Sequence, residues 1–173
     1  IEANKYGNPE AWSPKNDDGN YGGDKTLTDA LANSVNTITA RLMDKVGPQP
    51  VADLARRLGI TSNIPEVPSI ALGTPDISVY EMVGAYSAFA NQGVYTKPVM
   101  ITRIEDKMGN VLERFTPESN EAMSEETAYL MISLMKGVVE SGTGIRLRYT
   151  YGLNNPIAGK TGTTQNQSDG WFM

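Results

Sequence analysis

Cysteine and histidine are both absent from this sequence. The absence of cysteine excludes disulfide bonds and a thiolate nucleophile, and the absence of both residues excludes zinc sites of the usual cysteine and histidine type. Histidine is also the side chain that most often acts as a general acid or base. Any acid–base chemistry must therefore come from lysine, serine, tyrosine or a carboxylate, and we expect neither a bound metal nor a cofactor.

Long apolar runs and an excess of positive charge are also lacking. No stretch approaches the roughly 20 apolar residues that a membrane helix needs, and no signal peptide is recognisable. The formal net charge is -5 without a long run of either sign, which argues against nucleic acid as the main partner. The 173 residues are 39% hydrophobic and 20% charged, as in an ordinary globular segment. The abrupt apolar end at 171–173 leads us to interpret residues 1–173 as one partial domain.

The spacing of apolar residues predicts mostly helices. Residues 1–25 are rich in glycine, proline, asparagine and aspartate, which indicates an ordered loop. Apolar positions three and four residues apart predict one helix from Leu27 to Lys45 and a second carrying residues 51–58. A capping-box pattern at Ser78 starts another helix. A long helix is predicted after Ser124.

Strands are predicted in the second half of the chain. Residues 99–105 and 111–115 are typical of a β-hairpin. Residues 156–164 predict a later strand, followed by a polar turn over 165–169 and the start of another strand.

Two short motifs carry candidate chemistry. Ser34-Val35-Asn36 lies within the first predicted helix, and Lys160-Thr161-Gly162-Thr163-Thr164 lies on the late strand. Each is weak alone, because two polar residues on a solvated helix face, or an edge strand with a glycine bulge, explain it equally well. In this order, however, they fit the second and third elements of the serine acyl-transferases that act on D-alanyl peptides and β-lactams.

The surroundings of both motifs sharpen this match. Residues 26–36 resemble the stretch that leads into the Ser-x-Asn element, and residues 68–73 and 85–94 resemble the middle segment of the same family. Residues 159–164, followed by 169–172, resemble its Lys-Thr-Gly strand and the next one. The resemblance covers nearly the whole chain and is to the transpeptidase domain of class A (bifunctional) penicillin-binding proteins.

The resemblance implies a fold and a function. The fold is the α/β (α+β type) architecture shared with serine β-lactamases, an antiparallel sheet flanked by helices, of which this chain holds mostly the helical part. The parent enzyme would cross-link peptidoglycan on the periplasmic or cell-surface side of the cytoplasmic membrane. It would attack D-Ala-D-Ala stem peptides, release D-alanine and be acylated by β-lactams. A glycosyltransferase domain and a membrane anchor would belong to the parent.

The resemblance also assigns three residues to catalysis. Ser34 would pass protons between the nucleophile and the leaving amine. Asn36 would hold the substrate amide and orient a nearby lysine. Lys160 would supply positive potential for the substrate carboxylate and for the Ser34 hydroxyl.

The rest of the late motif would bind substrate. Thr161 and Thr163 would donate hydrogen bonds to the carboxylate, and the backbone N–H of Thr163 would form half of an oxyanion hole. Gly162 would let the substrate lie against the strand as an added strand. Thr164 completes the substrate-binding set.

The chain departs from the family in one respect. The family's Ser-x-x-Lys element, which carries the nucleophile, should precede Ser34, and residues 1–33 contain no match. The only match, Ser133 to Lys136, follows Ser34 in a helix whose apolar spacing already explains it. We therefore expect an incomplete site and an inactive isolated chain.

Alternative functions remain open at this stage. A D,D-carboxypeptidase or β-lactamase of the same fold would use water as the acceptor. A non-catalytic binding module would need no nucleophile. An exposed strand edge would also favour self-association. Gly142-Thr143-Gly144 suggests phosphate binding only weakly, because the other glycines and the lysine of a phosphate-binding loop are missing.

Overall fold

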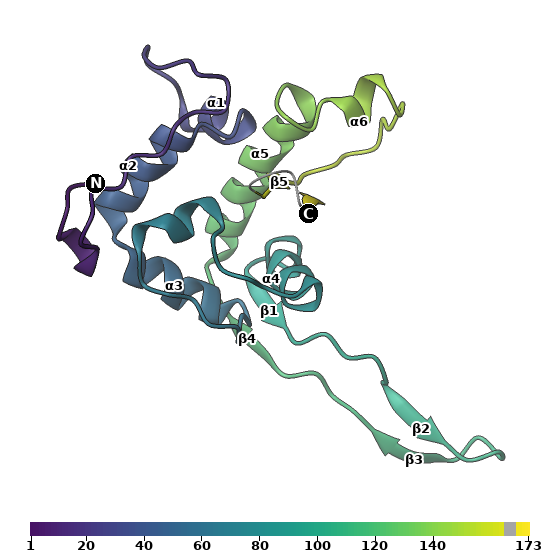
Figure 1. The fold of residues 1–173 in the computed structure, drawn as a ribbon. Helices are drawn as coiled ribbons and strands as arrows, with labels where there is room; N and C mark the ends of the chain where they lie inside the picture. The colour runs from purple at the N-terminus through teal and green to yellow at the C-terminus, as the bar shows by residue number, and fades with distance from the viewer. Residues whose placement is uncertain (165–168) are drawn as a thin grey trace.

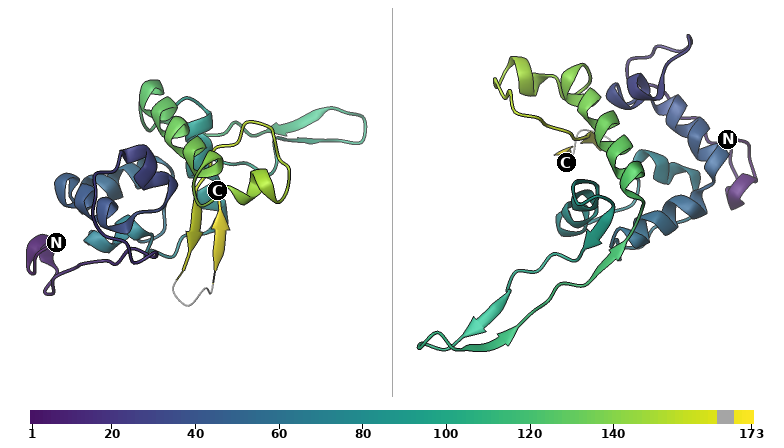
Figure 2. Two further views of the ribbon diagram at one scale, coloured as in Figure 1. Left: turned by 90° about the horizontal axis from the view of Figure 1, so that it is seen from above. Right: turned by 180° about the vertical axis from the view of Figure 1, so that it is seen from behind.

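The computed structural model describes residues 1–164 and 169–173. Its helices pack against one another, and a long hairpin projects from them (Figures 1 and 2). The turn expected over 165–169 lies, except for its last residue, outside the described residues. No helix of the described part is long and apolar enough to cross a membrane. The helices are α1 (Leu27–Ala32), α2 (Asn36–Val46), α3 (Pro48–Arg57), α4 (Val79–Ala90), α5 (Glu125–Glu140) and α6 (Arg146–Tyr149), with 3-10 turns η1 (Lys5–Gly7) and η2 (Pro68–Leu72).

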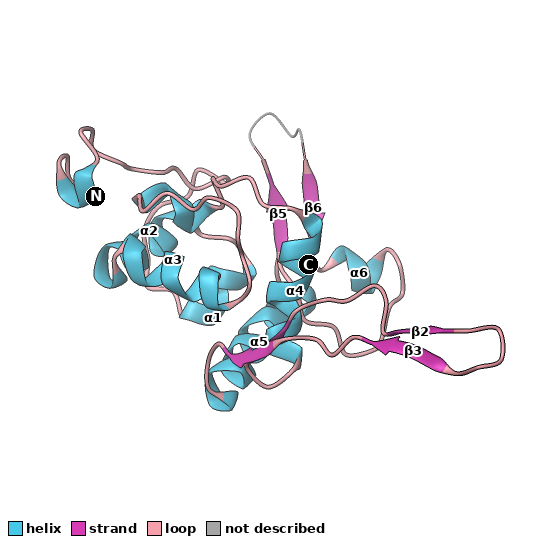
Figure 3. Ribbon diagram, turned by 90° about the horizontal axis from the view of Figure 1, so that it is seen from below, coloured by secondary structure: helices cyan, strands magenta, loops and turns pink. Residues whose placement is uncertain are grey.

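The strands form three separate antiparallel pairs in the described residues (Figure 3). The predicted hairpin and late strand are present, but both are shorter than expected, since the strand predicted over 156–164 covers only Thr161–Thr163. A further pair, which the sequence did not predict, joins the end of α4 to the segment before α5. The pairs are β1 (Val94–Thr96) with β4 (Ser119–Glu121), β2 (Arg103–Glu105) with β3 (Val111–Arg114), and β5 (Thr161–Thr163) with β6 (Gly170–Phe172).

The continuous helix expected from Leu27 to Lys45 is wrong, because the chain breaks between α1 and α2. The N–H of Ser34 donates to the carbonyl of Leu31 at 3.2 Å, and the N–H of Val35 donates to that of Ala30 at 2.9 Å. This pair of bonds is the Schellman arrangement that ends helices. Ser34 takes the left-handed position of the motif, with φ 52°. Ser34-Val35-Asn36 therefore lies at a helix junction instead of inside a helix.

The break changes which residues the two helices bury. Leu27 and Leu42 have the apolar spacing that predicts one helix, but their side chains are 54% and 40% exposed. Three alanines are buried in their place, together with Val35 and Met43. The buried set is Ala30, Ala32, Val35, Ala40 and Met43.

The main core lies between α3, α4 and the β1–β4 pair. Alanines occupy its tightest positions, which lets these elements approach closely. Its buried members are Ala52, Leu58, Ile60, Ile64, Ala85, Ala88 and Ala122. The long helix α5 packs against both α1 and α4 and buries Ala128, Met135, Val138 and Val139. This helix therefore joins the Ser34 region to the core.

A single carboxylate fastens α4 to the loop that follows α3. The capping box predicted at Ser78 is present, and its partner is Glu81. Beyond the box, the carboxylate of Glu81 accepts hydrogen bonds from the backbone N–H and hydroxyl groups of Thr61 and Ser62 at 2.8–2.9 Å. The hydrogen bond from the Ser78 hydroxyl contributes most to the pKa of Glu81, followed by those from Ser62 and Thr61. Together they hold this pKa well below its ordinary value of 4.5.

We predict that Glu81→Gln lowers the melting temperature of the chain at neutral pH. The neutral amide accepts weaker hydrogen bonds and turns an NH₂ group toward groups that are themselves donors. The pKa of Glu81 is lower in the folded state than in the unfolded state. The contribution of the carboxylate to the free energy of unfolding is therefore complete above the ordinary pKa of 4.5, and it is lost progressively as the pH falls below that value.

The melting-temperature gap between wild type and variant should therefore shrink on acidification. Glu113→Gln on exposed β3 is the matched control and should leave the melting temperature nearly unchanged. An equal gap at neutral pH and at about pH 3 would contradict this role of Glu81.

Candidate functional site

Ser34 and Lys160 lie 126 positions apart in the sequence and meet in the structure. The Lys160 ammonium donates a hydrogen bond to the Ser34 hydroxyl and a second one, at 2.9 Å, to the carbonyl of Thr161. The contact expected from the resemblance is thus present. Burial lowers the pKa of the Lys160 ammonium from its ordinary value of 10.5. A half-buried cation that faces a hydroxyl supplies a positive potential for an anionic ligand.

The left-handed turn at Ser34 presents this hydroxyl to Lys160. Left-handed backbone favours glycine, because a Cβ crowds the neighbouring carbonyl. A serine in this conformation carries a local cost that surrounding contacts must offset, and such positions cluster at functional sites. The hydroxyl of this serine accepts the hydrogen bond from Lys160. The strained backbone therefore coincides with the predicted site.

The N-terminal loop fastens the start of α2. Val35, the residue before α2, provides no side-chain cap. Instead, the side-chain oxygen of Asn16 accepts the N–H of Thr37 at 3.0 Å, and Asn16 is itself only 9% exposed. Sequence reasoning missed this residue, because a cap supplied from 21 positions away leaves no local pattern.

Asn36 also contacts this loop. Its side-chain NH₂ donates to the carbonyl of Lys15 at 2.8 Å. Among the described residues no hydrogen bond joins the Asn36 side chain to Ser34 or Lys160. The structure therefore brings together two of the three predicted catalytic residues through a direct bond and places Asn36 next to Ser34 by its position at the start of α2.

The late motif forms β5 and pairs on one edge only within the described residues. Lys160 extends the pairing by exchanging backbone hydrogen bonds with Met173 at 2.8 and 3.1 Å. Thr163 is exposed, as a ligand-binding residue must be. The Thr164 hydroxyl, by contrast, already has a partner within the chain, because it accepts a hydrogen bond from the N–H of Asp169 at 2.8 Å. The open edge of β5 offers backbone groups to an extended peptide.

Two glycines of this segment differ in the room around them. A Cβ on Gly159 would lie 2.4 Å from the carbonyl oxygen of Met173, so packing within the chain requires glycine there. A Cβ on Gly162 would meet only Trp171, at an ordinary 3.6 Å. Gly162 therefore keeps free a space that this chain itself does not fill.

The other candidate serine and lysine are not part of this site. Ser133 and Lys136 are exposed on α5, and no described hydrogen bond joins them to each other, to Ser34 or to Lys160. The described residues also contain no cluster of three or more carboxylates, histidines or cysteines that could hold a metal.

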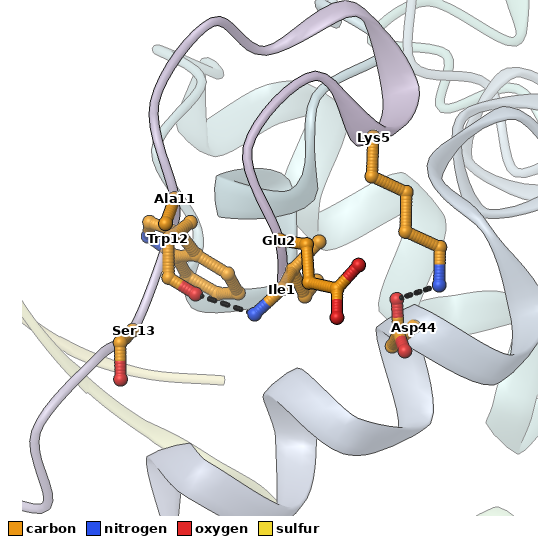
Figure 4. A pocket seen from close by; sticks show the side chains of 7 residues that line it. All are labelled: Ile1, Glu2, Lys5, Ala11, Trp12, Ser13 and Asp44. Carbon is orange, nitrogen blue, oxygen red and sulfur yellow. Dashed lines mark hydrogen bonds and ion pairs between the residues drawn. The ribbon is translucent and has the colours of Figure 1, made fainter.

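A pocket near the first residues is a separate feature (Figure 4). It lies beside an ion pair between Lys5 and Asp44 at 2.6 Å. The α-amino group of Ile1 donates to the carbonyl of Trp12 at 2.7 Å. Both side chains of the ion pair are solvent-accessible, and such pairs contribute little stability. The pocket shares no residue with the Ser34–Lys160 pair.

Comparison with known proteins gives one consistent result. The family described as penicillin binding protein transpeptidase domain matches residues 1–172. The chain is 38% identical to penicillin-binding protein 1A of Clostridium novyi, over 97% of this chain and 20% of that protein. It is 38% identical to penicillin-binding protein 1A of Aquifex aeolicus, over 95% of this chain and 22% of that protein. The chain thus spans about a fifth of the length of these curated relatives.

Solved structures show the same fold. The crystal structure of penicillin-binding protein 1A from Haemophilus influenzae has a TM-score of 0.84 at 24% identity and covers 93% of this chain and 30% of that chain. The PonA1 protein of Mycobacterium tuberculosis, in complex with penicillin V, has a TM-score of 0.72 at 27% identity, with 90% and 44% covered. The predicted α+β fold is confirmed as a partial domain of this type.

We predict that Ser34→Gly is more stable than Ser34→Ala by about 1 kcal/mol. Both variants lose the hydroxyl, so the difference isolates the left-handed backbone at this position. Inside a helix the order would be reversed, with alanine about 1 kcal/mol better than glycine. Chemical denaturation of the two variants measures the difference. A more stable alanine variant would show that Ser34 is helical in solution.

Proposed function

The chain belongs to the penicillin-binding protein transpeptidase family, and on this premise we propose that it forms part of a D,D-transpeptidase that cross-links peptidoglycan stem peptides. The hydrogen bond between Lys160 and Ser34 is the observation that carries the proposal. It joins the second and third elements of the family's catalytic set across 126 positions. We also assign residues 1–173 to a single partial transpeptidase domain, working outside the cytoplasmic membrane.

The proposed chemistry is acyl transfer to a serine. The serine oxygen forms a bond to the carbonyl carbon of the penultimate D-alanine, and the bond from that carbon to the nitrogen of the terminal D-alanine breaks. The nucleophile's proton passes through the Ser34 hydroxyl to the leaving nitrogen. An amine of a neighbouring stem peptide then takes the acyl group. A β-lactam acylates the same serine when its ring opens.

Lys160 acts through its charge in this scheme. Its ammonium donates to the Ser34 oxygen, so the Ser34 hydrogen stays free to move toward the leaving group. The same positive charge attracts the substrate's terminal carboxylate. Partial burial strengthens this attraction because it weakens solvent screening.

The substrate would lie along the open edge of β5. Thr161 and Thr163 would donate to its carboxylate, and the N–H of Thr163 would stabilise the oxyanion. Asn36 would hold the substrate amide with its side-chain oxygen, because its NH₂ group already donates to Lys15. A role for Thr164 in binding would require its hydroxyl to bond substrate in addition to Asp169.

Two alternatives use the same fold. A D,D-carboxypeptidase or β-lactamase would pass the acyl group to water. The similarity to penicillin-binding proteins 1A over nearly the whole chain favours the transpeptidase. A non-catalytic binding module is the alternative for the isolated chain.

We predict that the isolated 173-residue chain forms no covalent adduct with a labelled penicillin. No Ser-x-x-Lys element precedes Ser34, so the nucleophile is missing from these residues. A full-length protein that contains this chain should be acylated, and Lys160→Ala should slow that acylation at least tenfold, about the effect of losing one charge-assisted hydrogen bond.

Intact-mass spectrometry of both proteins measures the adduct. An adduct on the isolated chain that maps to Ser133 would overturn the assignment of the site. A full-length protein that is never acylated would overturn the proposed function itself.

We predict that Gly162→Ala leaves the folding of the chain intact but impairs acylation of the full-length protein. The added methyl group meets only an ordinary contact within the chain, whereas it occupies the space proposed for substrate. Gly170→Ala on β6, where a Cβ would have no neighbour within 4 Å, is the matched control. Equal acylation rates for wild type and both variants would argue against a substrate lying along β5.

A further inference from the structure

The turn between α5 and α6, residues 141–144, is held tightly against the end of α1. The N–H of Thr143 donates to the carbonyl of Ala32 at 2.9 Å, and the N–H of Gly144 donates to that of Val138 at 2.9 Å. Gly142 is buried, and a Cβ there would lie 2.1 Å from the carbonyl oxygen of Ala32. Glycine at this position therefore permits the close approach. Ala32 lies two residues before Ser34, so the turn is anchored beside the left-handed junction.

Thr143 also contacts the strand that carries the late motif. Its hydroxyl oxygen lies 2.5 Å from the hydroxyl oxygen of Thr161, the first residue of β5. Thr143 therefore connects the α1 end, through its backbone, with the Lys-Thr-Gly strand, through its side chain. The Thr143 side chain is exposed, so this contact is not explained by the filling of a core.

A hydroxyl has one hydrogen to donate and two lone pairs that accept. If Thr161 donates to Thr143, its remaining lone pairs face outward and repel an anion. If Thr143 donates to Thr161, the Thr161 hydrogen is free to point outward, and the incoming bond polarises it. A carboxylate binds only to the second arrangement.

We infer that Thr143 is a positioning residue that donates to the Thr161 hydroxyl and so directs the Thr161 hydrogen toward the substrate's carboxylate. This inference rests on the proposed function, because it requires a carboxylate ligand at Thr161. The backbone hydrogen bond from Thr143 to Ala32 holds Thr143 in place and links the orientation of Thr161 to the end of α1, two residues before Ser34.

The test uses a full-length protein that contains this chain and measures its second-order acylation rate with a labelled penicillin. Thr143→Val is nearly isosteric but cannot donate, and it should lower the rate about tenfold. Thr143→Ser keeps the hydroxyl and should retain most of the rate. Thr116→Val, at an exposed site after β3, is the matched control and should equal wild type.

A double-mutant cycle separates positioning from a general structural effect. If Thr143 acts through Thr161, Thr143→Val should have no further effect in a Thr161→Val background. Melting temperatures of all variants check that each is folded. A Thr143→Val rate equal to wild type, or independent losses that add in the double mutant, would overturn the inference while the proposed function stands. A wild-type protein that is not acylated would overturn the proposed function as well.

Discussion

The left-handed backbone of Ser34 is the constraint on which the site depends. It ends α1, starts a second helix in a new direction, and turns a hydroxyl toward Lys160. A helical Ser34 would continue α1 and carry the side chain along its surface. The local cost of a Cβ in this conformation is about 1–2 kcal/mol. The two Schellman bonds at the end of α1 and the cap from Asn16 offset it.

Contacts between distant segments hold this junction from both sides. Asn16 reaches the start of α2 from the N-terminal loop, while the turn at Thr143 approaches the end of α1. The carboxylate of Glu81 plays a similar part at the start of α4. It accepts hydrogen bonds from Ser78, just before α4, and from Thr61, in the loop that follows α3. In each case a polar side chain or backbone group satisfies donors and acceptors that a helix end leaves free.

Under the proposed function, the chain would supply two of the three elements that acyl transfer of this kind needs. Ser34 and Lys160 would provide a path for a proton and a positive potential, and β5, which pairs on one side only in the described residues, would offer its other edge to a peptide. The nucleophile belongs to an element outside these residues under the proposed function. Such a division is physically reasonable, because the Ser34–Lys160 contact depends on α5 and on the junction, both of which lie within the chain.

Much of the local structure and of the candidate chemistry can be inferred from short stretches of the sequence. The capping box at Ser78 and the hairpin are set by side chains close together in the chain, and each of the two motifs is itself a short run of residues, so all of these could be predicted. The position of the break between α1 and α2 depends on packing between distant segments, because apolar spacing is compatible with one helix or two. The tertiary structure also decided that Asn16 caps α2 and that Thr143 meets Thr161. Those contacts join residues 18 or more positions apart, and nothing in a linear pattern records which distant donor will reach which acceptor.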